Sequence, residues 1–449
     1  MSEVAIPPAV LPRSIGVVGG TLLTLSCLTP ASSLFVVVPS LLSHTGTGTL
    51  LVIVVAAVLC AGVALCYAEL AALVPSAGGE YAMAAVLAGR FAGWLMFVLS
   101  LVSVMVIPPI IALGTAGYLA AVVDASPQAT GATVMVVATL TGLLNLRANA
   151  WITGVFLALE VVTVAVVSFL GLVHVERPLS VLVDLEVGRA GAGVDALAII
   201  TALGGALFVL QGFTSAVYLS EEMRDPRRTV VRTVMWTLAI GAGLIMAPVL
   251  AIILGAPDIV TLSGGDVAGM TAGWSNSCIA TFVSLSIALA IANAVIVIVI
   301  QNSRVLFASA RDRAWPGVVS RALGTVSGRF GSPWVATLAV GLGGAALTFA
   351  PVETLTGVTS VVVTATYLGV AVTALVARRS LFTGALAWRM RGWPVLPALI
   401  SLALACVLAQ QRAADLVIVL VTLILASGYW VTYLRRRPAD RWIVTVVPD

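Results

Sequence analysis

Three groups of residues have the types and spacing to bind a small charged solute. Glu160 is the only acid in the apolar segment WITGVFLALEVVTVAVVSFLGLV. The second group surrounds Pro30 in the apolar segment VGGTLLTLSCLTPASSLFVVVP. The third group is Gln-Gly-Phe, residues 211–213, which interrupts a third apolar segment. Four hydroxyl side chains flank the proline: Ser26, Thr29, Ser32 and Ser33. A carboxylate can hold a proton or a cation, and a broken helix offers N–H groups to a carboxylate and C=O groups to an ammonium.

The composition identifies the surroundings of these groups. Of the 449 residues, 60% are hydrophobic and only 9% are charged, and the mean hydropathy is +1.13. A soluble domain carries roughly 25% charged residues, so this chain cannot cover a water-facing surface with charge. Apolar runs of about 20 residues recur along its length, each long enough to span a bilayer as a helix. Because unpaired backbone groups are too costly in lipid, we expect an all-α integral membrane protein.

Twelve spans are predicted, and the arginines indicate their orientation. The spans cover residues 14–41, 49–74, 91–121, 130–146, 151–173, 195–220, 231–254, 277–301, 333–350, 355–376, 394–409 and 414–434. The chain has no Lys, and its 23 basic residues are all Arg. With a cytoplasmic N-terminus, 20 arginines fall on inner segments and 3, at Arg177, Arg189 and Arg412, fall outside. This bias predicts a multi-pass protein of the cell (plasma or inner) membrane with both termini in the cytoplasm.

The interruptions in the first and sixth spans predict a binding site near the middle of the membrane. Pro30 removes a backbone donor and crowds the carbonyl four residues back, and Gly212 weakens the helix around it. Two interrupted helices five spans apart are typical of an inverted repeat with a midplane site. The alternative is that Gly and Pro merely kink membrane helices. The third span favours this alternative, because its Pro108-Pro109 is a stronger breaker without a repeat partner.

Three segments in register resemble signature motifs of the amino acid–polyamine–organocation transporter superfamily. CYAELAALVPSAGGEYAMA, residues 66–84, is similar to the family motif at the end of the second helix. FVLQGFTSAVYLSEEMRDPRRTVVRTV, residues 208–234, is similar to the Gly-Phe, Glu-Glu and Pro-Arg pattern after the sixth. SRVLFASARDRAWP, residues 303–316, is similar to the Ser-Arg and Ala-Arg-Asp pattern after the eighth. The resemblance extends over about residues 10–435 and implies an amino acid permease-like protein.

The resemblance implies a leucine-transporter-like fold, with five helices, five more in inverted topology, and two extra helices. The implied repeats are about residues 14–173 and 195–376, and the extra helices about 394–434. One transmembrane domain would then cover residues 1–434, before a short cytoplasmic tail at 435–449. Helices 1 and 6 would be unwound at the substrate site, which we expect to contain Ser26, Thr29, Ala31, Ser32, Ser33, Gln211, Gly212 and Phe213.

The first helix departs from the family pattern at one place. Many relatives carry Gly-Ser-Gly-Ile-Phe there, and the bare backbone of that segment holds the substrate carboxylate. The matching residues in this chain are Ala31-Ser32-Ser33-Leu34-Phe35, and Pro30 precedes them. The glycine nest is therefore absent, which weakens the case for a standard α-amino acid as the substrate.

Glu160 lies near the middle of the fifth span and is the only acid predicted deep in the membrane. An ionised carboxylate is costly there, so it must be protonated, paired or in contact with water. Its functional interpretations are proton coupling, binding of a substrate ammonium, or a cation site between helices 1, 5 and 8. The structural alternative is a hydrogen bond between helices. Several sodium-independent relatives place a Lys of helix 5 at the cation position, which this Lys-free chain cannot do. Three more polar residues are candidates for a cation site or a gate: Glu69, Ser286 and Asn293.

These features favour a secondary active transporter that moves an amino acid or a related small amine by alternating access, with proton coupling. A sodium-independent exchanger of amino acids or polyamines and a channel are the alternatives, and sodium remains an alternative coupling ion. The spans hold no cluster of nucleophile and base or of metal ligands, which argues against an enzyme. A nucleotide-driven pump is excluded because the chain lacks the G-x-x-x-x-G-K-[ST] motif. We expect no cofactor, metal or nucleic acid, and a monomer or homodimer in the lipid bilayer.

Overall fold

The computed structural model describes residues 13, 15–76, 78–119, 125–144, 146–188, 191–378 and 388–444, without the side chains of residues 146–153, 221 and 277. Helices dominate these ranges, because a chain this apolar has to pair its backbone groups within each segment. One antiparallel hairpin, β1 (Glu186–Val187) with β2 (Ala192–Gly193), departs from the all-α expectation within the described ranges. The protein is therefore an all-helical membrane protein with a small hairpin in one connection.

The first half of the chain contains one broken helix and four long continuous ones. Its elements are α1 (Val17–Leu28), α2 (Pro30–Ser32), the π-helical η1 (Ser33–Val37), α3 (Val38–Thr45), η2 (Gly46–Gly48), α4 (Thr49–Leu73), α5 (Gly79–Leu87), α6 (Arg90–Leu119), α7 (Pro127–Gly142), α8 (Leu146–Val173) and η3 (Leu179–Leu182). The first four of these replace what would otherwise be a single spanning helix.

The second half contains a second broken helix. Its elements are α9 (Ala196–Val209), the 3₁₀-helical η4 (Phe213–Glu222), α10 (Pro226–Gly255), α11 (Ile259–Gly264), α12 (Val267–Gly273), α13 (Ser277–Arg311), α14 (Gly317–Leu323), α15 (Trp334–Leu347), α16 (Val352–Ala377), α17 (Val395–Ala409), α18 (Ala413–Tyr429) and η6 (Trp430–Leu434). Asp195, Asp258, Asp266 and Asn276 start four of these helices by accepting a hydrogen bond from the N–H three residues on.

Helices occupy every range in which a span is predicted, although fewer helical stretches pass a test of length and apolar composition. Seven helical stretches in the described ranges are long and apolar enough to cross a membrane, and Val17–Leu73 counts as one of them. The pair Ala196–Val209 and Phe213–Ser220, bent by 42°, would be an eighth. A count of twelve therefore stays a prediction.

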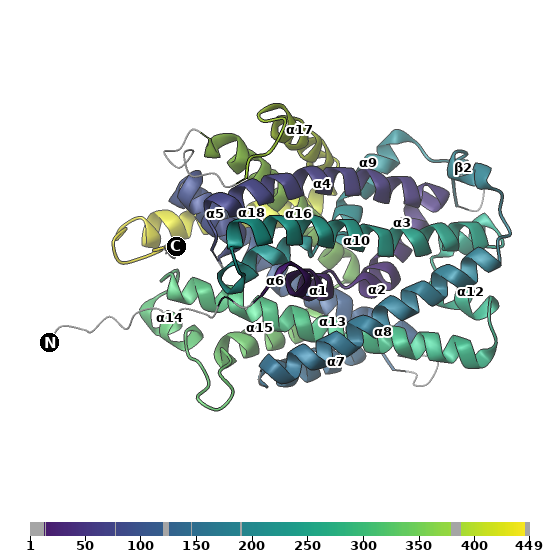
Figure 1. The fold of residues 1–449 in the computed structure, drawn as a ribbon, viewed down its shortest axis with the longest axis horizontal. Helices are drawn as coiled ribbons and strands as arrows, with labels where there is room; N and C mark the ends of the chain where they lie inside the picture. The colour runs from purple at the N-terminus through teal and green to yellow at the C-terminus, as the bar shows by residue number, and fades with distance from the viewer. Residues whose placement is uncertain are drawn as a thin grey trace.

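The long helices lie roughly along one axis, with the broken helix α1–α2 in the middle of the bundle (Figure 1). β2 and α12 lie at one end of this axis, and α5, α14 and the C-terminus lie at the other. Helix α8 packs against α10, α13 and α2, and α4 packs along α10. This arrangement surrounds the break in the first span with α6, α8, α10 and α13.

Helix α6 continues through Pro108-Pro109 as one helix of 30 residues. The pair that looked like the strongest breaker in the sequence therefore does not break its helix. The interruptions occur instead at Thr29-Pro30 and at Gln211-Gly212.

Candidate functional site

The break in the first span is centred on Thr29. Its backbone is left-handed, with φ +49° and ψ +69°, and Pro30 begins the next short helix. The Thr29 N–H donates to the carbonyl of Leu25 at 3.0 Å, and the Ser33 N–H donates to the carbonyl of Thr29 at 3.0 Å. Because Pro30 has no N–H, the carbonyl of Ser26 lacks its helical donor. The break thus combines a left-handed residue with the loss of one helical hydrogen bond.

The break in the sixth span touches the break in the first. Helix α9 ends at Val209, and Gly212 adopts φ +120° before η4 begins. A Cβ added to Gly212 would lie 2.4 Å from the Cα of Leu28 and 2.7 Å from its N. Both the backbone angle and this close approach require glycine. The two interrupted helices therefore meet backbone to backbone, directly before Thr29.

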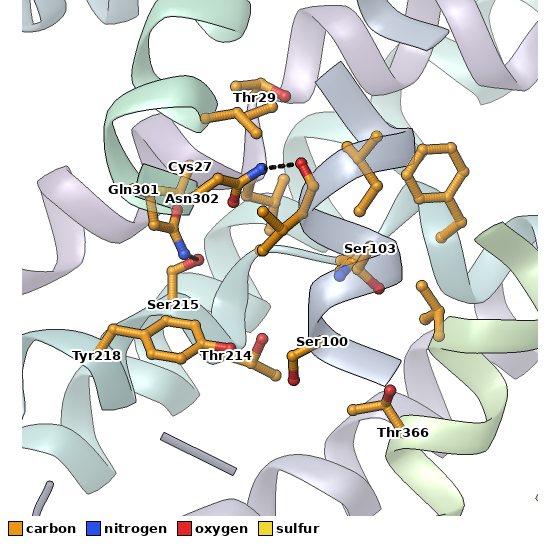
Figure 2. Close-up of a pocket in the computed structure, with 18 of the residues that line it drawn as sticks. Cys27, Thr29, Ser100, Ser103, Thr214, Ser215, Tyr218, Gln301, Asn302 and Thr366 are labelled. Atoms are coloured by element: carbon orange, nitrogen blue, oxygen red, sulfur yellow. Dashed lines mark hydrogen bonds between the residues drawn. The ribbon is translucent and has the colours of Figure 1, made fainter. Parts of the chain in front are cut away.

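A cavity of about 90 Å³ lies beside this contact. Figure 2 shows that several helices contribute to it, with Cys27 from α1, Ser215 and Tyr218 from η4, Ser100 from α6 and Gln301 from α13. The Nε2 of Gln301 donates to the Oγ of Ser215 at 2.8 Å. The remaining polar residues of the lining are Thr29, Ser32, Ser33, Tyr67, Glu80, Ser103, Gln211, Thr214, Asn302, Thr366 and Tyr367.

Five buried polar atoms of this lining have no hydrogen-bond partner in the described part of the chain. They are Ser32 Oγ, Glu80 Oε2, Gln211 Oε1, Thr366 Oγ1 and Tyr367 Oη. Buried polar groups are nearly always hydrogen-bonded, because leaving one unpaired costs about 1–3 kcal/mol. A group of them around one cavity indicates that a polar ligand or water completes the site.

Five of the eight expected substrate-site residues line this cavity: Thr29, Ser32, Ser33, Gln211 and Gly212. The other three are buried but stand outside its lining. The Ser26 hydroxyl donates to the carbonyl of Leu22 at 3.0 Å, and Ala31 is fully enclosed. Phe213 packs edge-on against Tyr67, with ring centroids 6.4 Å apart. Phe213 supports the cavity wall from behind.

Glu160 lies on α8, away from the cavity lining. Its side chain is 1% exposed, and neither carboxyl oxygen has a hydrogen-bond partner among the described residues. Ser286 and Asn293 are buried on α13, which packs against α8, and neither lines the cavity. The Oδ1 of Asn293 also lacks a partner in the described ranges. The side-chain oxygens of Glu160 and Asn293 therefore receive neither a hydrogen bond nor a positive charge from the described residues.

Glu69 is fully engaged at the end of α4. Its Oε1 accepts from the Nε of Arg378 at 2.6 Å, and its Oε2 accepts from the Nη2 of Arg378 and the N–H of Met390, each at 2.9 Å. The hydrogen bond and the charge of Glu69 raise the pKa of Arg378. This pair links the end of the second span to the segment after α16.

Within the described residues, no three His, Cys, Asp or Glu side chains gather to hold a metal ion.

Sequence reasoning missed Glu80, Gln301 and Thr366 as members of the lining. Glu80 belongs to the PSAGGEY motif, but it follows the predicted second span and carries no sign of facing a cavity. Gln301 and Thr366 look like ordinary polar residues of apolar helices. The packing of α5 against α6 and α16, and of α13 against α6, brings these residues together.

Comparison with known proteins gives one family. The profile described as "Amino acid permease" matches residues 14–432. An uncharacterized transporter of Mycobacterium tuberculosis is 29% identical over 348 residues, which is 76% of this chain and 74% of that protein. The branched-chain amino acid permease of Bacillus subtilis is 22% identical over 413 residues, 87% of this chain and 86% of that one. The human b(0,+)-type amino acid transporter 1 is 28% identical over 234 residues, 49% of this chain and 47% of that one.

Proposed function

Because the chain belongs to the amino acid permease family of the amino acid–polyamine–organocation superfamily, we propose that it is a secondary active transporter that works by alternating access. Its substrate is an amino acid or a related small amine. The family consists of transporters rather than enzymes, and its members act in membranes as multi-pass proteins.

One observation carries this proposal: the breaks in two helices meet at a cavity whose lining holds unpartnered polar atoms. Gly212 approaches the backbone of Leu28, and Thr29 and Ser32 lie at the same point of the first span. Broken helices expose N–H and C=O groups that can bind the carboxylate and the ammonium of a solute. The unpartnered oxygens of Gln211 and Tyr367 add side-chain acceptors for an ammonium.

Alternating access requires the helices around the cavity to move. The broken helices are suited to such movement, because fewer hydrogen bonds hold each half to the other.

We also propose the finer architecture expected from the resemblance. One transmembrane domain covers residues 1–434 with twelve spans, in repeats at about 14–173 and 195–376, and both termini are cytoplasmic. The arginine distribution supports this orientation. A reporter fused after Asp449 should be active only in the cytoplasm, and activity outside the cell would refute the orientation. The protein acts as a monomer or homodimer.

The coupling ion in this proposal is the proton, with Glu160 as the residue that carries it. Glu160 is buried in the bundle and unpartnered in the described ranges, as a residue that exchanges a proton would be. A sodium-independent exchange of amino acids or polyamines is the alternative mode. A sodium site near Ser286 and Asn293 would instead make Glu160 a charge-balancing residue.

Counter-flow in proteoliposomes tests the proposed function. Vesicles loaded with unlabelled amino acids or amines should accumulate the labelled compound saturably, whereas an ohmic current would identify a channel. Gln211→Leu should lower uptake at least about tenfold, because it removes a polar group from the cavity. Ser427→Ala on α18 is the control, since among the described residues its hydroxyl bonds to the carbonyl of Leu423 within its own helix and to no other group.

A further inference from the structure

Glu80 brings a carboxyl group into the cavity from α5. Its Oε1 accepts hydrogen bonds from the Oη of Tyr218 at 2.6 Å and from the Oγ of Ser100 at 2.9 Å. Its Oε2 has no partner among the described residues, and the residue is only 6% exposed. Two hydroxyls therefore fix the carboxyl group in place and leave one oxygen free.

Among the described residues, Glu80 has no ion-pair partner. The cavity lining that they form contains no other Asp or Glu and no Arg, Lys or His. Other acids at this end of the bundle are paired: Glu69 with Arg378 at 2.6 Å and Glu222 with Arg304 at 3.6 Å. A buried carboxylate without a partner is costly, so its position beside a cavity suggests that a ligand supplies the positive charge.

Burial raises the pKa of Glu80 and favours its neutral form, so the ionised form needs a nearby positive charge, and two local features support it when a cation is present. The residue lies in the first turn of α5, where the helix dipole stabilises negative charge. The Tyr218 hydroxyl donates to the Oε1 of Glu80 at 2.6 Å, and the Ser100 Oγ lies 2.9 Å from the same oxygen and 3.0 Å from the carbonyl of Met96.

Other groups of the same lining suit a cation. Gln211 Oε1, Thr366 Oγ1 and Tyr367 Oη have no partner among the described residues, and each can accept a hydrogen bond. An ammonium carries three N–H donors and a guanidinium five. The aromatic residues Tyr67 and Tyr367 also line the cavity.

We propose that Glu80 selects substrates with a net positive charge. These are amines, or amino acids whose side chain carries an ammonium or guanidinium group. This inference rests on the proposed function and narrows its substrate class. Glu80 binds the positive group directly, while Tyr218 and Ser100 position its carboxylate. The proposed function places the α-ammonium of a neutral amino acid at the broken helices, so such a substrate leaves the charge of Glu80 unpaired and binds more weakly.

Binding of three matched compounds to the full-length protein in detergent tests the inference. L-Lysine and L-norleucine share a carbon chain but differ in the side-chain ammonium, and 1,5-diaminopentane resembles lysine without its carboxylate. By calorimetry, lysine or the diamine should bind the wild-type protein about tenfold to a hundredfold more tightly than norleucine. Equal or tighter binding of norleucine, or no binding of any of the three, would overturn the proposal without need of a variant.

The variant Glu80→Gln keeps the shape of the side chain and removes the charge. It should lose the preference for the two cations while its affinity for norleucine stays within about threefold. Glu80→Asp keeps the charge and should retain part of the preference. If Glu80→Gln weakens all three compounds equally, the residue is structural; if it keeps the preference, another group selects the cation. Either result refutes the inference.

Uptake separates this inference from the proposed function. If the wild-type protein transports norleucine and rejects the cations, the transporter function stands and the role of Glu80 is wrong. If the cations bind through Glu80 but cross the membrane neither by uptake nor by exchange, the selectivity stands and the transport proposal is wrong. Glu353→Gln, which alters an exposed carboxylate paired with Arg412, is the matched control.

Discussion

Asn302 donates its Nδ2–H to the carbonyl oxygen of Val104 at 2.8 Å, which joins α13 to α6 (Figure 2). Val104 is four residues before Pro108, whose nitrogen carries no proton, so the normal helical donor is missing. Asn302 replaces that donor from a different helix. This bond helps α6 to stay helical through Pro108-Pro109.

Asn302→Leu should lower the free energy of unfolding by about 1–3 kcal/mol, because the carbonyl of Val104 would be buried without a donor. Pro108→Ala returns an N–H to the helix and should recover most of this loss in the double variant. Thermal melting of the two single variants and the double variant measures the coupling. Strictly additive effects would show that Asn302 does not act through Val104.

The same bond shows why breaks in helices were hard to rank from sequence. Pro108-Pro109 is the stronger local signal, but its cost is offset by a side chain 198 residues away from Val104. Near Pro30, the backbone instead turns into the left-handed region at Thr29. The sequence could indicate each weak point, whereas the partner that repairs one of them depends on tertiary packing.

Gly212→Ala should impair both stability and transport. The added Cβ would meet the backbone of Leu28 at 2.4 Å, and φ +120° is strained for any other residue. We expect a loss of about 1–3 kcal/mol from the backbone strain alone, together with uptake reduced at least about tenfold. Gly243→Ala on α10 is the control, because a Cβ there meets no atom within 4 Å. Wild-type melting and uptake in Gly212→Ala would contradict the close contact.

Prediction of the site was limited by side-chain direction and by contacts distant in sequence. Ser26, Ala31 and Phe213 lie beside the breaks, yet their side chains do not line the cavity, because the helical period does not hold across an interrupted helix. Glu80 was missed for a different reason. Its partner Tyr218 is 138 residues away, and α5 is a short helix after the predicted second span.

Arg378→Gln should lower the free energy of unfolding by about 3–5 kcal/mol, since it leaves the buried carboxylate of Glu69 without its counterion. Glu69→Gln combined with Arg378→Gln should cost less than the two single changes added together. The exposed pair of Glu353 and Arg412, 3.7 Å apart, serves as the control cycle and should show a coupling of about 0–1 kcal/mol. Equal coupling in the two cycles, measured by melting, would argue against a buried ion pair.

Trp442 anchors the residues that follow η6 to the end of the bundle near α5. It is 1% exposed, its Nε1 donates to the carbonyl of Arg90 at 3.1 Å, and its ring lies 5.4 Å from that of Trp94 and 5.6 Å from that of Phe97. Trp442→Ala should destabilise the protein by about 3–5 kcal/mol. Trp236→Ala, at a residue 58% exposed, should change stability by about 0.5 kcal/mol or less. Similar melting temperatures for the two variants would show that the segment is not anchored.

Glu160→Gln should separate substrate binding from coupling. The side chain is buried and neither oxygen is bonded to a described residue, so the neutral amide should fit without a large loss of stability. The variant cannot release a proton, so it should bind substrate but lose the response of uptake to an imposed pH gradient. The assay is uptake into liposomes with and without the gradient, each with and without sodium, and Glu353→Gln is the control.

Uptake that requires sodium, with full gradient-driven transport in Glu160→Gln, would exclude proton coupling through this residue. Loss of binding in the variant would instead place Glu160 in substrate recognition.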